Sequence, residues 1–248
     1  MPRLQSKLAE IFTVTTWRNS IITDGGIASD TPCVWDASNT FSNPKYNSDF
    51  PDEEGDYYLM YDMFAFTNPF TVAAAGNCYT INADKRPVIG TAVFAPNYFG
   101  PEFNLASQVH TAVHETFHAL GFNDNVIGEV TGGLGRETQR QTTRFYVTSE
   151  YATEFARDHF SCPTLLGAEI ENDGGTGTEL SHIEERTFGD SIMTGWVNRR
   201  DSLLSGAELA IMKDLKWYTV NMTAKQPLFW GKNQGCNFGY LPCIDKAT

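Results

Sequence analysis

The segment VHTAVHETFHALGF, residues 109–122, decides the fold of this chain. Apolar side chains recur along it at helical spacing, which predicts one largely buried helix, and Gly121 marks the expected end. His114 and His118 are four residues apart, so they share one helix face, with Cβ atoms about 5–6 Å apart. Two imidazoles at this spacing can bind one zinc ion, and Glu115 beside them can take a proton from water at the metal. The segment therefore predicts half of a zinc site.

Composition narrows the class of protein. The chain has 248 residues, enough for one large domain or for two subdomains that share a cleft. No apolar run approaches the roughly 18 residues of a membrane helix. The net charge of -12 argues against nucleic acid as a partner and favours solubility. Residues 1–14 lack the apolar core of a secretory signal, so we expect a mature domain or a trimmed fragment.

The cysteines leave two readings open. There are five of them and no C-x-x-C pair, so a thioredoxin-like motif or a zinc ribbon is not expected. In an exported protein they would form two disulfides and leave one thiol, in any of 5 × 3 = 15 arrangements. In a cytosolic protein they would be five buried thiols. The cysteines are Cys33, Cys78, Cys162, Cys236 and Cys243.

The amino-terminal half has an α+β pattern. Residues 4–14 have helical spacing, and residues 15–52 are rich in Asn, Asp, Ser and Thr, with one short strand expected near residues 21–22. Gly90 suggests a bulge or a close backbone approach in the last of three predicted strands. These strands are residues 57–64, 71–81 and 87–95.

The carboxy-terminal half is predicted as loops and helices. Residues 122–137 are rich in Gly and Asn and should form a loop, and residues 172–178 should form a linker. Residues 149–160 have helical spacing with Ser149 as the cap. Residues 205–215 form a second helix, opened by a capping box of Ser205 and Glu208.

A third zinc ligand is needed after the helix. The compact metzincin motif H-E-x-x-H-x-x-G-x-x-H requires a histidine at position 124, where this chain has Asp124. Far downstream, His182 in SHIE is followed eleven residues later by Met193 in the turn-like sequence DSIMTG. Metzincins pair their zinc motif with a methionine turn under the metal. A long insertion before His182 would therefore restore the pattern.

Several motifs in one order resemble the leishmanolysin family of surface zinc metalloproteases, which belongs to the metzincin clan. The resemblance runs through nearly the whole chain. Its motifs are RPVIGTAVFAP (residues 86–96), HETFHALGF (114–122), ARDHFSCPTLLGAEIENDGGTG (156–177), SHIEER-x-x-x-D-x-IMTG (181–195) and LFWGKNQGCNFGYLPC (228–243).

The resemblance implies an α+β, metzincin-type catalytic domain. A mixed twisted sheet and the zinc helix would stand above a mostly irregular or helical lower subdomain, with the active-site cleft between them. Residues 1–121 would be the amino-terminal catalytic subdomain, 122–181 the insertion, and 182–248 a truncated carboxy-terminal subdomain with the methionine turn. By analogy with metzincins, the strand at residues 87–95 would form the upper rim of the cleft and pair with substrate.

The resemblance also implies the site. One Zn²⁺ per chain would be held by His114, His118 and His182, and Met193 would pack beneath it without binding it. Glu115 would be the general base that takes a proton from a zinc-activated water. The substrates would be proteins or peptides. The reaction would be hydrolysis of internal peptide bonds.

For the cysteines, the resemblance implies the pairs Cys33–Cys78 and Cys162–Cys236. Cys243 would pair with a residue beyond the end of this sequence. Disulfides imply an extracellular or cell-surface protein, with membrane association through segments outside this chain. The sequon at Asn221 matters only in an exported protein.

Other residues compete for these roles. His110 shares the helix face, but it lies about 12 Å along the axis from His118, too far for both to bind one zinc. We interpret it as a cleft-edge or core residue, and His159 as a hydrogen-bonded structural imidazole. Glu150 and Glu154 are the alternative third ligands, since other zinc peptidases use a helical glutamate. Glu184 and Arg186 fit outer-shell or structural ion pairs.

Two other functions compete with a peptidase. The first is an inactive zinc-bearing surface or adhesion module, which the presence of Glu115 argues against. The second is a zinc hydrolase of another kind, with a glutamate as third ligand.

Overall fold

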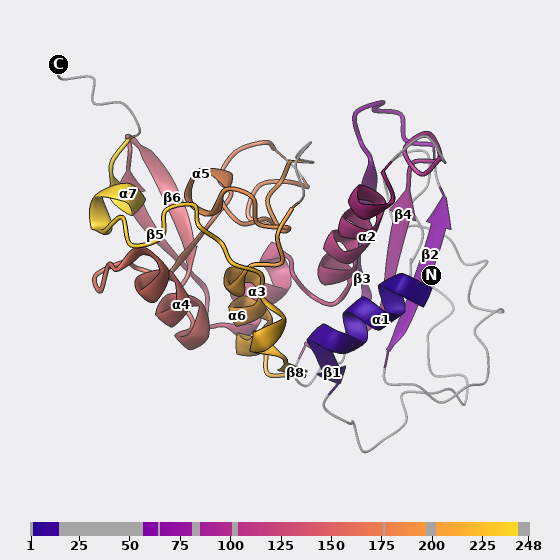
Figure 1. Cartoon of the computed structure of the whole chain (residues 1–248), viewed down its shortest axis with the longest axis horizontal. Helices are drawn as coiled ribbons and strands as arrows, with labels where there is room; N and C mark the ends of the chain where they lie inside the picture. Colours follow the sequence, from indigo (N-terminus) through magenta and orange to yellow (C-terminus); the bar gives the residue numbers. More distant parts are fainter. Residues whose placement is uncertain are drawn as a thin grey trace. The chain divides into compact units, whose positions relative to one another are not determined.

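The computed structural model describes residues 2–14, 57–63, 65–80, 85–100, 104–175, 177–196 and 202–242. The described residues form an α+β structure, as the sequence predicts, and their strands lie in several small sheets (Figure 1). The chain divides into two compact units. Unit 1 comprises Met1–Gln5 and Val14–Gly121, and unit 2 comprises Ser6–Thr13 and Phe122–Thr248. The strand expected near residues 21–22, and also Cys33 and Cys243, lie outside the described residues.

Unit 1 is built on a three-stranded sheet in the order β2-β4-β3. The strands β2 (Tyr58–Met63), β3 (Ala73–Thr80) and β4 (Pro87–Phe94) confirm the three predicted ones. β4 runs parallel to β2 and antiparallel to β3, and all its residues are buried. Its sequence is apolar except for the buried Thr91, which suits a central strand. The prediction that this strand pairs with substrate is wrong, because neighbouring strands already occupy both of its edges.

The helix α2 (Leu105–Ala119) packs against β3 and β4 (Figure 1). It begins where the Asn104 side chain accepts a hydrogen bond from the Ala106 amide at 2.8 Å, which satisfies a helix-end donor. It ends before Gly121, whose φ of 112° lies in a region that favours glycine. The predicted helix and its stop are thus confirmed.

Gly90 allows a close approach between β4 and the end of α2. The Tyr57 hydroxyl donates to the Ala119 carbonyl oxygen at 2.6 Å. A Cβ atom on Gly90 would lie 2.0 Å from that hydroxyl oxygen and 2.9 Å from the Ala119 Cβ. The predicted close backbone approach is confirmed, while the register shift of this strand pair lies on β3, beginning between Asn77 and Tyr79.

The first helix, α1 (Pro2–Ile11), is shorter than predicted. The residues that follow, β1 (Phe12–Val14), form a strand that pairs with β8 (Tyr218–Val220). The Phe12 and Tyr218 rings lie 5.7 Å apart in this pair. Aromatic and β-branched residues favour strands, and a partner from the far end of the chain completes the ladder.

Unit 2 contains a helix and a strand where the sequence predicted a loop. Residues 122–137 include α3 (Asp124–Val130) and most of β5 (Leu134–Gln139), so that prediction is wrong. Asn123 caps α3 by accepting from the Val126 amide at 3.0 Å. β5 joins an antiparallel sheet with β6 (Thr142–Val147) and β7 (Ala168–Ile170).

The remaining helices of unit 2 are α4 (Glu150–Phe160), α5 (Glu185–Phe188), α6 (Gly206–Asp214), the 3-10 helix η2 (Met222–Ala224) and α7 (Cys236–Tyr240). The predicted capping box of Ser205 and Glu208 is present on α6. Ser149 stands at the start of α4 but does not cap it with its side chain. Instead, the Asp214 carboxylate accepts from the Ala152 amide at 2.9 Å. None of the described helices combines the length and apolarity needed to cross a membrane.

Candidate metal centre

Two histidines converge on one face of α2. The Nε2 atoms of His114 and His118 are 3.0 Å apart, with ring centroids at 4.7 Å. Two nitrogen ligands of one tetrahedral zinc, each at 2.0–2.1 Å, lie about 3.3 Å apart. The separation in the structure is close to this value. The helix alone therefore presents two ligands suited to one metal ion.

Glu115 lies between these histidines in the sequence and is buried, with 6% of its surface exposed. Burial raises the pKa of its carboxyl group to about 8. A carboxylate removed from water favours the neutral form unless a positive charge is near, and a metal cation next to it would oppose this shift. The protonation of Glu115 should therefore depend on whether a metal cation is bound beside it.

His182 belongs to unit 2 and is also buried. Its Nδ1 lies 2.9 Å from the backbone carbonyl oxygen of Thr178. A carbonyl can only accept, so the proton of the neutral ring resides on Nδ1 and Nε2 keeps its lone pair. This is the usual arrangement of a metal-binding histidine, in which the second ring nitrogen is held by a carbonyl or carboxylate.

The predicted turn around Met193 is present in unit 2. The Thr194 amide donates to the Ser191 carbonyl at 3.3 Å, which closes a four-residue turn. The Met193 carbonyl accepts from the Ile183 amide at 2.8 Å, and the Met193 side chain is fully buried. The turn is therefore tied to the residue that follows His182.

Within the described residues, a single group of three or more side chains is suited to hold a metal ion. It consists of His114, His118 and His182, whose ligand nitrogens all lie within 4.8 Å of one another. Three imidazoles suit zinc and also copper, iron and nickel. The residues predicted as ligands from the sequence thus form a group that could bind a metal ion.

The competing residues stand apart from this group. His110 is not a member, although it lies on the same helix. Glu150 and Glu154 are exposed on α4 and are not members either. His159 donates from Nε2 to the Trp230 carbonyl at 2.8 Å, and burial lowers its pKa. The structure confirms the interpretation of His159 as a structural imidazole.

Glu184 and Arg186 do not pair with each other through their side chains. Glu184 Oε2 accepts from Arg144 at 3.1 Å, and Arg186 donates to the Phe238 carbonyl at 2.8 Å. Glu184 is thus in a structural ion pair, as predicted, although the sequence did not reveal its partner. Arg144 lies on β6, a strand that the sequence analysis did not identify.

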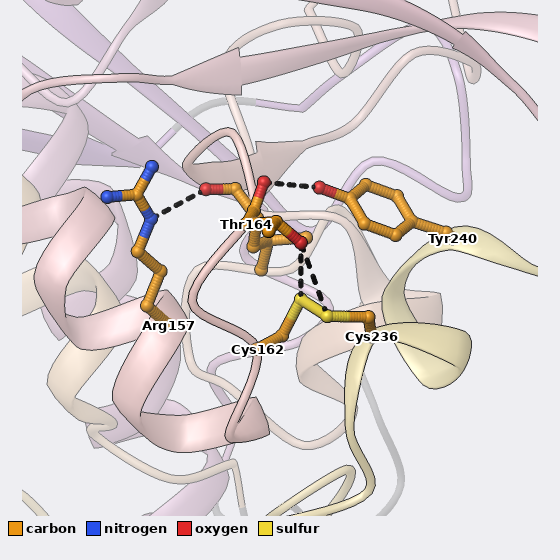
Figure 2. The surroundings of a disulfide bond; sticks show 6 residues. Arg157, Cys162, Thr164, Cys236 and Tyr240 are labelled. Carbon is orange, nitrogen blue, oxygen red and sulfur yellow. Dashed lines mark hydrogen bonds between the residues drawn. A yellow bond between two sulfur atoms is a disulfide. The ribbon is translucent and has the colours of Figure 1, made fainter.

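One disulfide joins the end of α4 to the start of α7. Cys162 and Cys236 are bonded, and the Thr164 hydroxyl oxygen lies 3.6 and 3.4 Å from their sulfur atoms (Figure 2). The Tyr240 hydroxyl donates to the Thr164 carbonyl at 2.7 Å (Figure 2). Cys78 is also disulfide-bonded. Three of the five cysteines are thus disulfide-bonded, so the alternative of five free thiols is wrong.

Comparison with known proteins decides the family. Residues 53–248 match the model of the peptidase M8 family, leishmanolysin. The chain belongs to the leishmanolysin family. A leishmanolysin-like peptidase of Drosophila pseudoobscura pseudoobscura is 32% identical over 216 residues, which covers 71% of this chain and 31% of that protein.

Similar proteins also occur in Xenopus laevis and Leishmania major. The ciliated left-right organizer metallopeptidase of Xenopus laevis is 30% identical over 212 residues, or 77% of this chain and 29% of that protein. The leishmanolysin of Leishmania major is 27% identical over 198 residues, or 77% of this chain and 31% of that protein. The chain spans about a third of the length of the curated relatives it matches.

Proposed function

We propose that this chain carries the catalytic centre of a zinc-dependent endopeptidase of the metzincin type. The observation that carries the proposal is the group of three imidazoles next to a buried glutamate. Membership of the leishmanolysin family supports it, as do relatives whose names describe them as peptidases. The substrates would be proteins or peptides.

One Zn²⁺ per chain would be held by His114, His118 and His182, with Met193 packed beneath the site and not bound to the metal. The residues fit the ion, because the Nε2 atoms of the two helical histidines are 3.0 Å apart and the Nε2 of His182 is left without a proton. When bound, zinc lowers the pKa of a water ligand from that of bulk water to about 7 and polarises the carbonyl of the peptide bond.

Glu115 would act as the general base. Its carboxylate takes a proton from the attacking water and then delivers it to the leaving amine. Burial raises the pKa of Glu115 to about 8, and a bound cation beside it would lower that pKa again, which would leave the carboxylate form able to accept a proton. Such proton transfer typically contributes a factor of 10²–10⁴ to the rate.

We further propose that the protein works outside the cell or at its surface. The disulfide between Cys162 and Cys236 and the bonded Cys78 support this placement, because disulfides are rare in the cytosol. Membrane attachment, where it occurs, would use segments outside the described helices.

Casein hydrolysis, measured together with zinc content, tests the proposal. Glu115→Gln should keep its zinc and lose at least about 100-fold in kcat, since it removes only the base. Glu154→Ala, the matched control on α4, should keep both zinc and activity. Wild type that is loaded with zinc but inactive would instead identify an inactive zinc-bearing module. Loss of zinc in Glu154→Ala would support a glutamate as third ligand.

A further inference from the structure

The His182 ring is held by a loop of its own chain. The Glu171 amide donates to the His182 carbonyl at 2.9 Å, and the Leu180 amide donates to the Glu171 carbonyl at 2.8 Å. These two bonds close the segment 171–182 into a loop. Thr178 lies within this loop, and its carbonyl oxygen accepts from His182 Nδ1 at 2.9 Å. The orientation of the ring therefore depends on where the Thr178 carbonyl points.

The Thr178 side chain is enclosed by two glycines. A Cβ atom on Gly174 would lie 2.8 Å from the Thr178 Cγ2 methyl group, and one on Gly195 would lie 2.6 Å from the same methyl group. Real Cβ atoms do not approach other atoms this closely. The methyl group of the half-buried Thr178 thus occupies space that only glycines leave open, which limits the positions that Thr178 can take.

Gly195 also lies near the histidine ring. Its Cβ position would be 3.6 Å from His182 Cγ, which is ordinary van der Waals distance. Gly195 does not adopt a positive φ, so its backbone conformation is open to alanine. Glycine at this position therefore leaves room for the Thr178 methyl group and is not needed for the backbone conformation. Gly195 comes two residues after Met193, so the turn brings it close to the ring.

We infer that Thr178, packed between Gly174 and Gly195, is the positioning residue for His182. Its carbonyl holds the proton on Nδ1 and directs Nε2 toward the metal, and its methyl group keeps that carbonyl in place. The inference rests on the proposed function, in which His182 is a zinc ligand. Partners of this kind typically change metal affinity 10–100-fold when they are altered.

A pair of substitutions tests the packing. Gly195→Ala should weaken zinc binding about 10–100-fold, because the new methyl group displaces Thr178. The double variant Gly195→Ala and Thr178→Ser lacks the methyl group of Thr178, which makes room for the alanine. It should recover most of the zinc affinity of wild type. Gly128→Ala is the matched control, because a Cβ atom there meets nothing within 4 Å, and it should leave zinc affinity unchanged.

Nitrogen NMR of His182 in the zinc-free protein provides a second readout that does not depend on catalysis. Wild type should show the proton on Nδ1, Gly195→Ala should show a mixture of tautomers, and the double variant should return to Nδ1. A folded Gly195→Ala variant with unchanged zinc affinity and unchanged tautomer would overturn the inference. If Gly195→Ala does not fold, the single variant Thr178→Ser tests the inference. It should also lower zinc affinity and show a mixture of His182 tautomers.

The two proposals fail in different ways. Wild type that shows the proton on Nδ1 but binds zinc equally well after His182→Ala would overturn the ligand role of His182 and leave the Thr178 contact standing. Wild type with the proton on Nε2 would overturn the positioning role alone.

Discussion

Tyr57 donates its hydroxyl hydrogen to the Ala119 carbonyl oxygen at 2.6 Å, and this bond ties the start of β2 to the residue that follows His118. The last carbonyls of a helix have no partner within the helix, so this bond satisfies one of them. Gly90 makes room for it, because any side chain there would overlap the hydroxyl. Within unit 1, the end of α2 is thus fixed to the sheet.

Tyr57→Phe should lower the free energy of unfolding by about 1 kcal/mol, because it removes one hydrogen bond and leaves the Ala119 carbonyl without this donor. Gly90→Ala should cost about 1–3 kcal/mol through overpacking. Urea denaturation measures both changes in the free energy of unfolding.

The control is Gly128→Ala, at a helix position with open space, which should raise stability by up to about 1 kcal/mol. Equal midpoints for wild type and Gly90→Ala would contradict the close packing.

Asp214 should prove essential to α4. Its carboxylate accepts from the Ser149 hydroxyl at 2.6 Å and from the Tyr151 and Ala152 amides at 3.0 and 2.9 Å. Asp214→Ala leaves these amides without an acceptor and should cost about 2–3 kcal/mol. Thermal unfolding measures the loss.

Asp158→Ala provides the comparison for Asp214. Asp158 lies exposed on α4 itself, so its removal should change stability by no more than about 0.5 kcal/mol. Equal melting temperatures for the two variants would show that Asp214 does not cap α4.

Stability should fall as pH rises from about 4.5 to about 7, in part because of Glu169. Burial raises the pKa of Glu169 to about 7 even though it pairs with Arg140. The folded state therefore binds its proton more tightly than the unfolded state, where the pKa is near 4.5. The resulting stabilisation, up to about 3 kcal/mol, is complete below pH 4.5 and is lost as pH approaches 7.

Urea denaturation between pH 5 and pH 8, in the presence of a chelator, measures how the free energy of unfolding changes with pH. Glu169→Gln cannot titrate, so its stability should vary less with pH than that of wild type. If the stability of Glu169→Gln changed with pH as much as that of wild type, Glu169 would not be the cause of the pH dependence.

The disulfide between Cys162 and Cys236 should contribute strongly to stability. The two cysteines are 74 residues apart, so the chain-entropy model gives about 4.5 kcal/mol. The double variant Cys162→Ala and Cys236→Ala should lose several kcal/mol in urea denaturation under oxidising conditions. Addition of a reductant should affect wild type more than this variant. A loss below about 1 kcal/mol would contradict the entropic account.

The sequence predicted best where local chemistry and tertiary structure agree. The capping box of Ser205 and Glu208 is a local signal, and α6 begins where it indicates. The helix with His114 and His118 was predicted in the same way, because its apolar periodicity matches the face it buries. Half of the candidate site could therefore be located without a structure.

The hairpin of β5 and β6 was missed for a physical reason. Its two-residue turn consists of Arg140 and Gln141, both with positive φ, at 51° and 65°. Turns of this type usually contain asparagine, aspartate or glycine, so the sequence carried no turn signal. Arg140 pairs with Glu169 and donates to the Gly239 carbonyl, contacts that stabilise the turn from outside it. Local sequence does not encode such long-range contacts.

His182 shows the limit of motif reasoning. The compact motif failed at Asp124, and only the order of His182 and Met193 along the chain, together with the family resemblance, indicated the third ligand. The Thr178 carbonyl that holds the ring could not be predicted, because a backbone contact leaves no trace in residue identity. Its two glycine neighbours are visible in the sequence, but their shared contact is not.

The zinc content of His182→Ala tests the central claim most directly. After dialysis against a weak chelator, wild type and the control His110→Ala should each retain about one zinc per chain. His182→Ala should retain little, because two imidazoles on one helix hold zinc poorly without the third. One zinc per chain in His182→Ala, at the affinity of wild type, would contradict the assignment of His182 as the third ligand.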